Sequence, residues 1–220
     1  MGFPAYRKID MAVWPRREHY EYYRGTLQCG YSMTARMDVT EVVRCARERD
    51  LGFFACFLYA ASKTVNETEE MKLMTGPDGE PGFWEVIHPN FTVFHEDDKT
   101  FSDVWTEYEP SFYSFYRGYQ QVMDRYGDVH GMRGRPDQPA NFFCISCVPW
   151  LDFVSYATYI DREPALFPII TFGKYTEAEG RYTLPVTVTI AHASADGYHT
   201  SQFYLRLQEN LRNFEALART

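Results

Sequence analysis

The feature that most constrains the fold is an alternating stretch near the C-terminus, YTLPVTVTIAH, at residues 182–192. Its apolar positions are Leu184, Val186, Val188 and Ile190, and three of the odd-numbered positions are threonine. A period of two places successive side chains on opposite faces of a β-strand. The stretch therefore predicts a strand that packs one face against an apolar core and presents a hydroxyl-bearing face on the other side.

His192 continues the apolar row, and an Asp196-Gly197 turn leads into a final helix. An apolar setting disfavours the charged form of an imidazole, and the neutral ring can accept a proton. The same residues also fit a strand-end histidine with one satisfied hydrogen bond, followed by an aspartate that only shapes a turn. We expect His199, at the start of the helix, to face solvent.

The remainder of the chain mixes helical and extended patterns without strict alternation. Helical spacing is present at residues 38–48, 53–65, 111–126 and 200–217. Extended patterns are present at 83–94, where Pro89 is expected to break the strand, and at 141–153, 167–175 and 182–192. We therefore predict an α+β fold, a two-layer sandwich of helices on a mixed, largely antiparallel sheet. A length of 220 residues suits one domain, residues 1–220.

Composition excludes several classes of protein. A formal net charge of −8 argues against a nucleic-acid-binding surface, and an aromatic content of 17% suits pockets for small aromatic or amphipathic ligands. No apolar run reaches the ~20 residues of a membrane helix, and the N-terminus lacks a secretory signal, so we expect a cytoplasmic protein. The five cysteines fit reduced thiols. Cys144 and Cys147 form a C-x-x-C without further ligands, so no metal site is expected.

The H-x-x-x-D-G motif at residues 192–197 resembles the signature of the CoA-dependent acyltransferases. Within that superfamily the chain resembles the chloramphenicol acetyltransferases, because four further blocks follow in the order of that family. They are WPRREHYEYY (14–23), HPNFTVFHEDDKTFS (88–102), ISCVPW (145–150) and FPIITFGKY (167–175). The resemblance extends from about Ile9 to Leu211, nearly the whole chain.

The resemblance implies acetyl transfer from acetyl-CoA to the primary hydroxyl of chloramphenicol, in a ternary complex and without an acyl-enzyme. His192 would be the general base. Ser146 would donate to the tetrahedral oxyanion, and Thr171 would help to hold the substrate, although both read as ordinary strand residues without the resemblance. Asp196 would pair with Arg16 and so hold the loop that carries His192.

The resemblance also implies binding residues and an assembly. The acceptor pocket corresponds to Tyr23, Tyr31, Phe101, Phe153 and Cys29. The acetyl-CoA site corresponds to Tyr175, near the adenine, Lys174, near a phosphate, and again Ser146. Members of the family assemble as homotrimers with active sites between subunits, and their activity gives antibiotic resistance.

Three departures from the family pattern leave alternatives open. Ala191 replaces the first of two adjacent histidines, and Gly52 replaces a lysine near the CoA phosphates, a role that Arg49 could supply. The stretch FVSYATYIDREPAL, residues 153–166, matches poorly where the acceptor pocket is expected. The alternatives are the same chemistry on a different hydroxylated small molecule, and a catalytically impaired homologue that binds CoA or another ligand.

Overall fold

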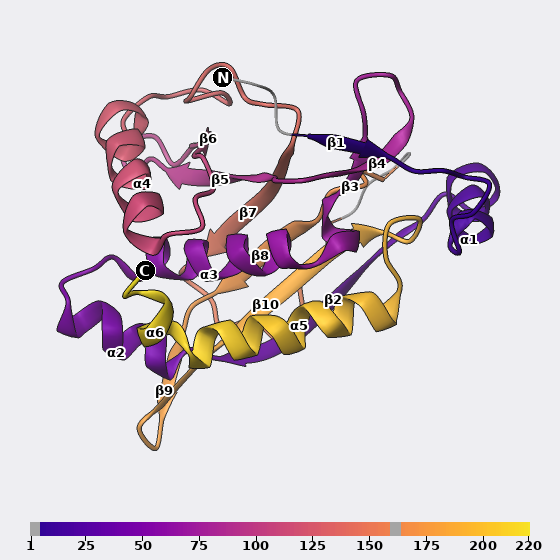
Figure 1. Ribbon diagram of the computed structural model, residues 1–220. Coiled ribbons are helices and arrows are strands. Elements are labelled where there is room, and N and C mark those ends of the chain that lie inside the picture. The colour runs from indigo at the N-terminus through magenta and orange to yellow at the C-terminus, as the bar shows by residue number, and fades with distance from the viewer. Residues whose placement is uncertain (1–4, 159–163) are drawn as a thin grey trace.

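The computed structural model describes residues 5–158 and 164–220 (Figure 1). Its strands are β1 (Tyr6–Lys8), β2 (Gly30–Asp38), β3 (Leu73–Thr75), β4 (Pro81–Trp84), β5 (His88–Phe94), β6 (Phe101–Trp105), β7 (Phe142–Val148), β8 (Ile169–Gly173), β9 (Thr176–Ala178) and β10 (Arg181–Ala191). Its α-helices are α1 (Arg17–Glu21), α2 (Thr40–Glu48), α3 (Phe53–Glu67), α4 (Phe112–Tyr126), α5 (Gly197–Arg212) and α6 (Phe214–Leu217). A short π-helix follows α1 at Tyr22–Thr26, and a 3-10 helix lies at Glu69–Lys72.

The strands form a main sheet and a small one. The main sheet has the order β2-β10-β8-β7-β5-β6, with β9 paired to β10, and the small sheet has the order β1-β4-β3. Strand β7 runs parallel to β5 and to β8, whereas the other pairs of the main sheet are antiparallel. The sheet is thus mixed and largely antiparallel, which confirms the predicted fold class.

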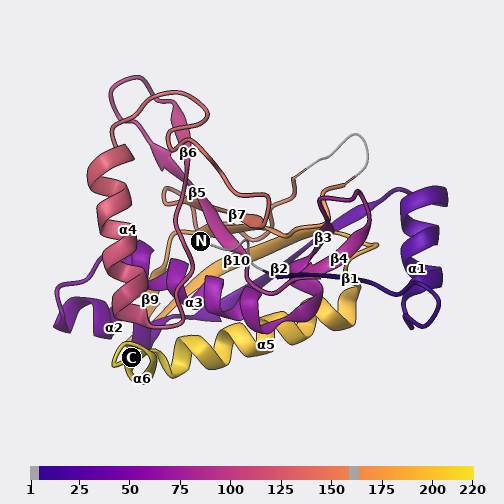
Figure 2. The same cartoon turned by 45° about the horizontal axis from the view of Figure 1, so that its top comes forward.

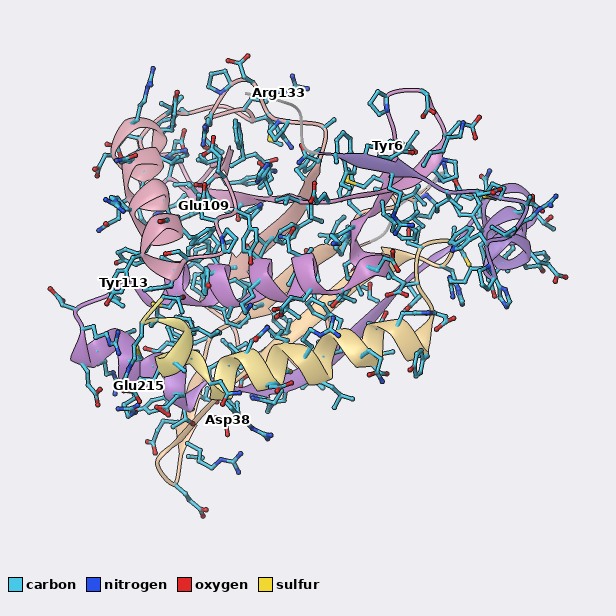
Figure 3. All side chains as sticks on the ribbon, in the orientation of Figure 1. Tyr6, Asp38, Glu109, Tyr113, Arg133 and Glu215 are labelled. Atoms are coloured by element: carbon cyan, nitrogen blue, oxygen red, sulfur yellow. The ribbon has the colours of Figure 1, made fainter. Side chains whose placement is uncertain are left out.

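Helices α2, α3 and α5 pack against one face of the main sheet, as the second view makes clear (Figure 2). Side chains fill the space between these two layers (Figure 3). The apolar row of β10 lies here, with Leu184, Val186 and Val188 fully buried and Ile190 only 2% exposed. The threonines of β10 point to the other face, where Thr187 and Thr189 hydrogen-bond to hydroxyls of β2. The alternation therefore predicted both faces of the strand correctly.

Two expectations about strands need correction. Pro89 does not break a strand but lies inside β5, where its carbonyl accepts a hydrogen bond from the Thr106 amide. The interruption falls instead between β4 and β5, which belong to different sheets. Strand β2 was not predicted, although it pairs with β10 over nine residues. Its inward side chains, Tyr31, Met33, Ala35 and Met37, give a weaker apolar alternation than those of β10.

Other boundaries differ by a few residues. The strand expected at 141–153 ends at Val148, before Pro149, a residue that cannot donate to a strand ladder. The last helix begins at Gly197 and ends at Arg212, and α6 follows it from Phe214 to Leu217. Asp196 caps α5, because its carboxylate accepts hydrogen bonds from the amides of Tyr198 and His199.

Candidate active site

His192 lies in the turn directly after β10, and aromatic rings fix its position. Its backbone amide donates to the Cys29 carbonyl oxygen at 3.0 Å. Its imidazole stacks on Tyr23, with ring centroids 3.9 Å apart and planes within 10°, and Tyr31 meets it edge-on at 5.3 Å. Among the described residues Nδ1 is buried without a hydrogen-bond partner, which leaves Nε2 as the nitrogen open to a substrate.

Asp196 pairs with Arg16, as the resemblance implied, across 180 residues of sequence. Arg16 Nη1 lies 2.7 Å from Asp196 Oδ2, with the two side chains 15% and 33% exposed. Burial alone would raise the pKa of Asp196, but the hydrogen bond from Arg16 and the contacts with His199 outweigh it and lower the pKa to about 2. The carboxylate thus stays charged while it caps α5, and the pair ties the N-terminal segment to the loop that carries His192. We call Arg16, Tyr23, Tyr31, His192 and Asp196 the histidine cluster.

His199 does not face solvent, so that expectation was wrong. Its Nδ1 lies 2.8 Å from Asp196 Oδ1 and 3.3 Å from Arg16 Nη1. Its Nε2 lies 3.6 Å from Glu70 Oε1, and its side chain is only 17% exposed. The cause is local, because the residue at the third position of a helix can return to the N-cap and complete a capping box. His199 therefore supports Asp196, and sequence spacing alone could have indicated this.

Ser146 and Thr171 lie side by side on the sheet face opposite the helices. They are register partners in the parallel pair β7 and β8. On the other side of Ser146, its hydroxyl oxygen lies 2.9 Å from Thr92 Oγ1 of β5. The sequence had not singled out Thr92, although it occupies the motif HPNFTVF. We call Thr92, Ser146 and Thr171 the serine cluster.

An apolar groove of about 520 Å³ opens at the carboxyl end of β7. Its lining includes Lys174 and Tyr175, the two residues that the resemblance assigned to acetyl-CoA, and also Thr92 of the serine cluster. Tyr175 packs edge-on against Phe53 at 4.8 Å and against Tyr182 at 5.8 Å, so its ring is fixed. The groove thus offers an apolar surface with a cation beside it, and its lining includes Thr92, whose hydroxyl contacts Ser146.

The residues assigned to the acceptor pocket divide between the two clusters. Cys29 and Tyr31 line a second pocket, of about 450 Å³, beside the end of β10. Phe101 lies in β6, two positions before Asp103, which is the register partner of Thr92. The ring of Phe153 lies against Gly173, two residues beyond Thr171 in β8. Phe101 and Phe153 therefore belong with the serine cluster.

The histidine and serine clusters lie far apart within one chain. Thr171 stands opposite Thr187 of β10, and His192 comes five residues later. At a rise of about 3.3 Å per residue, this separation is about 16 Å along the strand. Ser146 lies one strand further, and strands are about 4.8 Å apart. One chain alone does not bring His192 within hydrogen-bonding reach of an atom that is bound at Ser146.

The positions that depart from the family pattern have clear surroundings. Ala191 is the last residue of β10; it is buried and lines the pocket that contains Cys29. Gly52 caps α3, and its amide donates a hydrogen bond to the Tyr116 hydroxyl oxygen at 3.0 Å. Arg49 donates to the carbonyl of Ala218 at 2.9 Å, so its guanidinium is already engaged. Within the diverged stretch 153–166, residues 159–163 lie outside the described residues.

The C-x-x-C thiols lie on one strand, β7, three positions apart, and therefore point to opposite faces. Burial raises the pKa of Cys144 to about 11 and that of Cys147 to about 12. Both thiols are thus protonated near neutral pH and poorly placed to share a ligand. In the described part of the chain, no helix is both long and apolar enough to cross a membrane.

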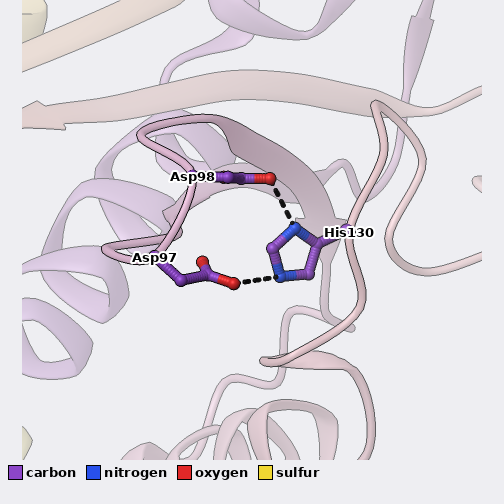
Figure 4. Close-up of side chains that lie close together, drawn as sticks. All are labelled: Asp97, Asp98 and His130. Carbon is purple, nitrogen blue, oxygen red and sulfur yellow. Dashed lines mark hydrogen bonds and ion pairs between the residues drawn. The ribbon is translucent and has the colours of Figure 1, made fainter.

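Asp97, Asp98 and His130 form a group of potential metal ligands that includes no residue of either cluster (Figure 4). Asp97, Asp98 and His130 place one ligand atom each within 4.8 Å of one another. The imidazole already contacts both carboxylates, Nδ1 to Asp98 at 2.9 Å and Nε2 to Asp97 at 3.5 Å. All three side chains are exposed, and the ion pairs account for their arrangement.

Comparison with solved structures identifies the class of fold. A structure of a chloramphenicol acetyltransferase superimposes with a TM-score of 0.82 at 23% identity, covering 94% of this chain and all of that one. A probable dihydrolipoamide acetyltransferase from Listeria monocytogenes superimposes with a TM-score of 0.65 at 15% identity, covering 92% of this chain and 93% of that one. The fold is therefore the one that these acetyltransferase structures share.

Sequence comparison identifies the family. The family model described as chloramphenicol acetyltransferase matches residues 4–208. A chloramphenicol acetyltransferase of Clostridium perfringens is 35% identical over 208 residues, which is 94% of this chain and 95% of that protein. One of Vibrio anguillarum is 32% identical and covers 96% of each chain. The chain belongs to the chloramphenicol acetyltransferase family, a family of acyltransferases.

Proposed function

We propose that this protein is an acetyl-CoA-dependent O-acetyltransferase that acetylates the primary hydroxyl of chloramphenicol and so gives resistance to the antibiotic. The observation that supports this most strongly is the setting of His192. Its ring is held between Tyr23 and Tyr31, and the Arg16–Asp196 pair ties down its loop. A fixed imidazole with one accessible nitrogen suits a general base.

In the proposed mechanism, His192 Nε2 accepts the proton of the acceptor hydroxyl as its oxygen attacks the thioester carbonyl. Ser146 donates a hydrogen bond to the carbonyl oxygen, which becomes negatively charged in the tetrahedral intermediate. When the intermediate collapses, the carbon–sulfur bond breaks, and the imidazolium returns its proton to the CoA thiolate. No acyl-enzyme is formed, because the acceptor oxygen attacks directly. Thr171, beside Ser146 in the register, helps to hold the acceptor.

The groove beside β7 is the proposed acetyl-CoA site. Tyr175 and the apolar lining would contact the cofactor's organic portion, and Lys174 would attract a phosphate. The groove reaches Thr92, and Thr92 contacts Ser146, so a thioester extending along it would arrive at the proposed oxyanion donor. Since acetyl-CoA is made inside cells, we place the reaction in the cytoplasm. We treat residues 1–220 as a single catalytic domain that requires no metal.

The separation of the two clusters supports an active site between subunits. The sheet face that carries Ser146 has no helical layer among the described residues, and a second chain packed there can bring its own His192 to it. We propose the homotrimer of the family. Each site would combine the serine cluster, Phe101 and Phe153 of one subunit with the histidine cluster and Cys29 of the next.

The diverged stretch 153–166 gives a reason to test another hydroxylated small molecule as the acceptor. A second alternative is a catalytically impaired homologue that only binds CoA or another ligand. The departures at Ala191 and Gly52 motivate this second alternative. The stacking of Tyr23 on His192 and the Arg16–Asp196 pair disfavour it. Both alternatives keep the fold and change what the site does.

One assay separates these possibilities. Thiol release from acetyl-CoA is followed with chloramphenicol, without an acceptor, and with a panel of other hydroxylated compounds. We expect release that depends on chloramphenicol and is abolished by His192→Ala, while circular dichroism and CoA binding stay unchanged. Preference for another acceptor would support the first alternative. Absence of turnover with every acceptor would support the second, and undiminished turnover of His192→Ala would overturn the assignment of the base.

A further inference from the structure

The serine cluster belongs to a polar row that crosses four neighbouring strands, β8, β7, β5 and β6, at one level. Ser146 is the register partner of Thr171 on one side and lies against Thr92 on the other. Thr92 in turn is the register partner of Asp103, at the edge of the sheet. Thr92 is also one of the residues that line the proposed acetyl-CoA groove. It therefore borders that groove while its hydroxyl contacts the proposed oxyanion donor.

The direction of the Thr92–Ser146 hydrogen bond decides what Ser146 can do. The two oxygens are 2.9 Å apart, and either hydroxyl could be the donor. A serine hydroxyl has one proton and two lone pairs. If Ser146 donates to Thr92, its proton is used within the protein. If Thr92 donates, Ser146 keeps its proton for a substrate oxygen.

The charge that develops beside Ser146 during the reaction favours donation by Thr92, because an oxyanion is a stronger acceptor for the Ser146 proton than a neutral hydroxyl. In the described part of the chain, neither hydroxyl makes a second side-chain hydrogen bond. Thr92 is β-branched, so its χ1 angle has few low-energy values and its hydroxyl direction is stiff. A hydroxyl that accepts one hydrogen bond also becomes a stronger donor for the next.

We propose that Thr92 is a positioning residue for acetyl transfer: its hydroxyl donates to Ser146 Oγ and thereby directs the Ser146 proton to the developing oxyanion. This inference rests on the proposed function. It adds a residue that acts through Ser146 without touching the reacting atoms. Because the bond matters most when charge develops on the carbonyl oxygen, its loss should lower kcat and leave the KM values nearly unchanged.

The test compares steady-state kinetics of Thr92→Val, Thr92→Ser, Ser146→Ala and the double variant, with acetyl-CoA and chloramphenicol. Valine keeps the shape of threonine without the hydroxyl, and serine keeps the hydroxyl. We expect kcat to fall about tenfold in Thr92→Val and about a hundredfold in Ser146→Ala. In Thr92→Ser, kcat should stay within about threefold of the wild-type value. Because Thr92 acts through Ser146, the double variant should be within about twofold of Ser146→Ala.

The matched control is Thr34→Val, which removes a similar cross-strand hydroxyl pair, Thr34 with Thr187 at 2.7 Å, three strands away from Ser146. It should retain wild-type kcat, and the thermal midpoints of both valine variants show whether folding is affected. The inference is overturned by a wild-type kcat in Thr92→Val, by a higher KM for acetyl-CoA at unchanged kcat, or by additive losses in the double variant. Wild-type protein without chloramphenicol-dependent thiol release would instead overturn the proposed function, and full activity of Ser146→Ala would overturn the role of Ser146.

Discussion

Complementation between two inactive variants tests whether the active site is shared between subunits. Ser146→Ala removes the proposed oxyanion donor, and His192→Ala removes the proposed base. The structure separates the two residues by about 16 Å along β10 and by two strand spacings across the sheet. A base must come within about 3 Å of the proton that it removes. We therefore expect the two side chains to come from different chains when they serve one reaction.

The expected activity follows from statistics. In a closed ring, each site takes Ser146 from one subunit and His192 from its neighbour. When the two variants mix randomly in equal amounts, half of the subunits carry an intact serine and half carry an intact histidine. About one quarter of all sites then contain both, and they all lie in mixed trimers, each of which has one such site in three. The mixed trimers purified through both tags should therefore regain about one third of wild-type activity. Each variant alone has no complete site.

The assay uses two differently tagged chains that are expressed together and purified through both tags. Thiol release from acetyl-CoA is measured for the mixed assembly, for each variant alone and for the wild type. A third preparation, in which one chain carries both substitutions and the other carries neither, is the matched control for assembly. Activity of the mixed assembly no higher than that of the single variants would refute the shared site and the reasoning from strand register.

Three further outcomes follow from the structure. Asp196→Asn should lower the free energy of unfolding by about 1–2 kcal/mol, less than a fully buried pair would lose, because its side chain is 33% exposed. Folding lowers the pKa of Asp196 to about 2. The carboxylate's contribution to the free energy of unfolding is therefore complete above pH ~4 and is lost as the pH falls through 2. Acid unfolding curves of the wild type and of Asp196→Asn would show this difference. Gly173→Ala should lower the free energy of unfolding by about 1–3 kcal/mol in denaturant titrations, because a Cβ would lie 2.7 Å from the Leu151 carbonyl oxygen. The control Gly197→Ala should be close to neutral, because a Cβ there would have no neighbouring atom within 4 Å. Tyr23→Ala should lower kcat about tenfold and Tyr23→Phe much less, because the stacked ring orients His192; equal kcat values for the two variants would contradict that role.

Much of the fold could be predicted from local patterns. The alternation of β10 predicted which side chains enter the core, since a period of two is a property of the strand itself. The helices at α2, α3, α4 and α5 were also found, to within a few residues, from their apolar spacing. Strand β2 was missed because its alternation is weak and its pairing with β10 joins segments 150 residues apart in the sequence. Pro89 was misinterpreted because the rule that proline breaks a strand treats that strand in isolation. The rule does not consider which backbone amides must donate hydrogen bonds in the assembled sheet.

In the candidate site, too, the features that could be predicted from the sequence are the local ones. The motif at residues 192–197 placed a histidine at a strand end and an aspartate before a helix, and both features are local. The capping contact of His199 is local too, and attention to helix caps would have found it.

The sequence by itself thus determined the types of element and the chemical groups at their ends, because backbone periodicity and capping act over a few residues. The family resemblance already implied that Arg16 meets Asp196, but only the tertiary structure decided that Thr92 meets Ser146 and that His192 stands apart from both hydroxyls. Those contacts depend on the order and register of distant strands, which the packing of the whole core selects.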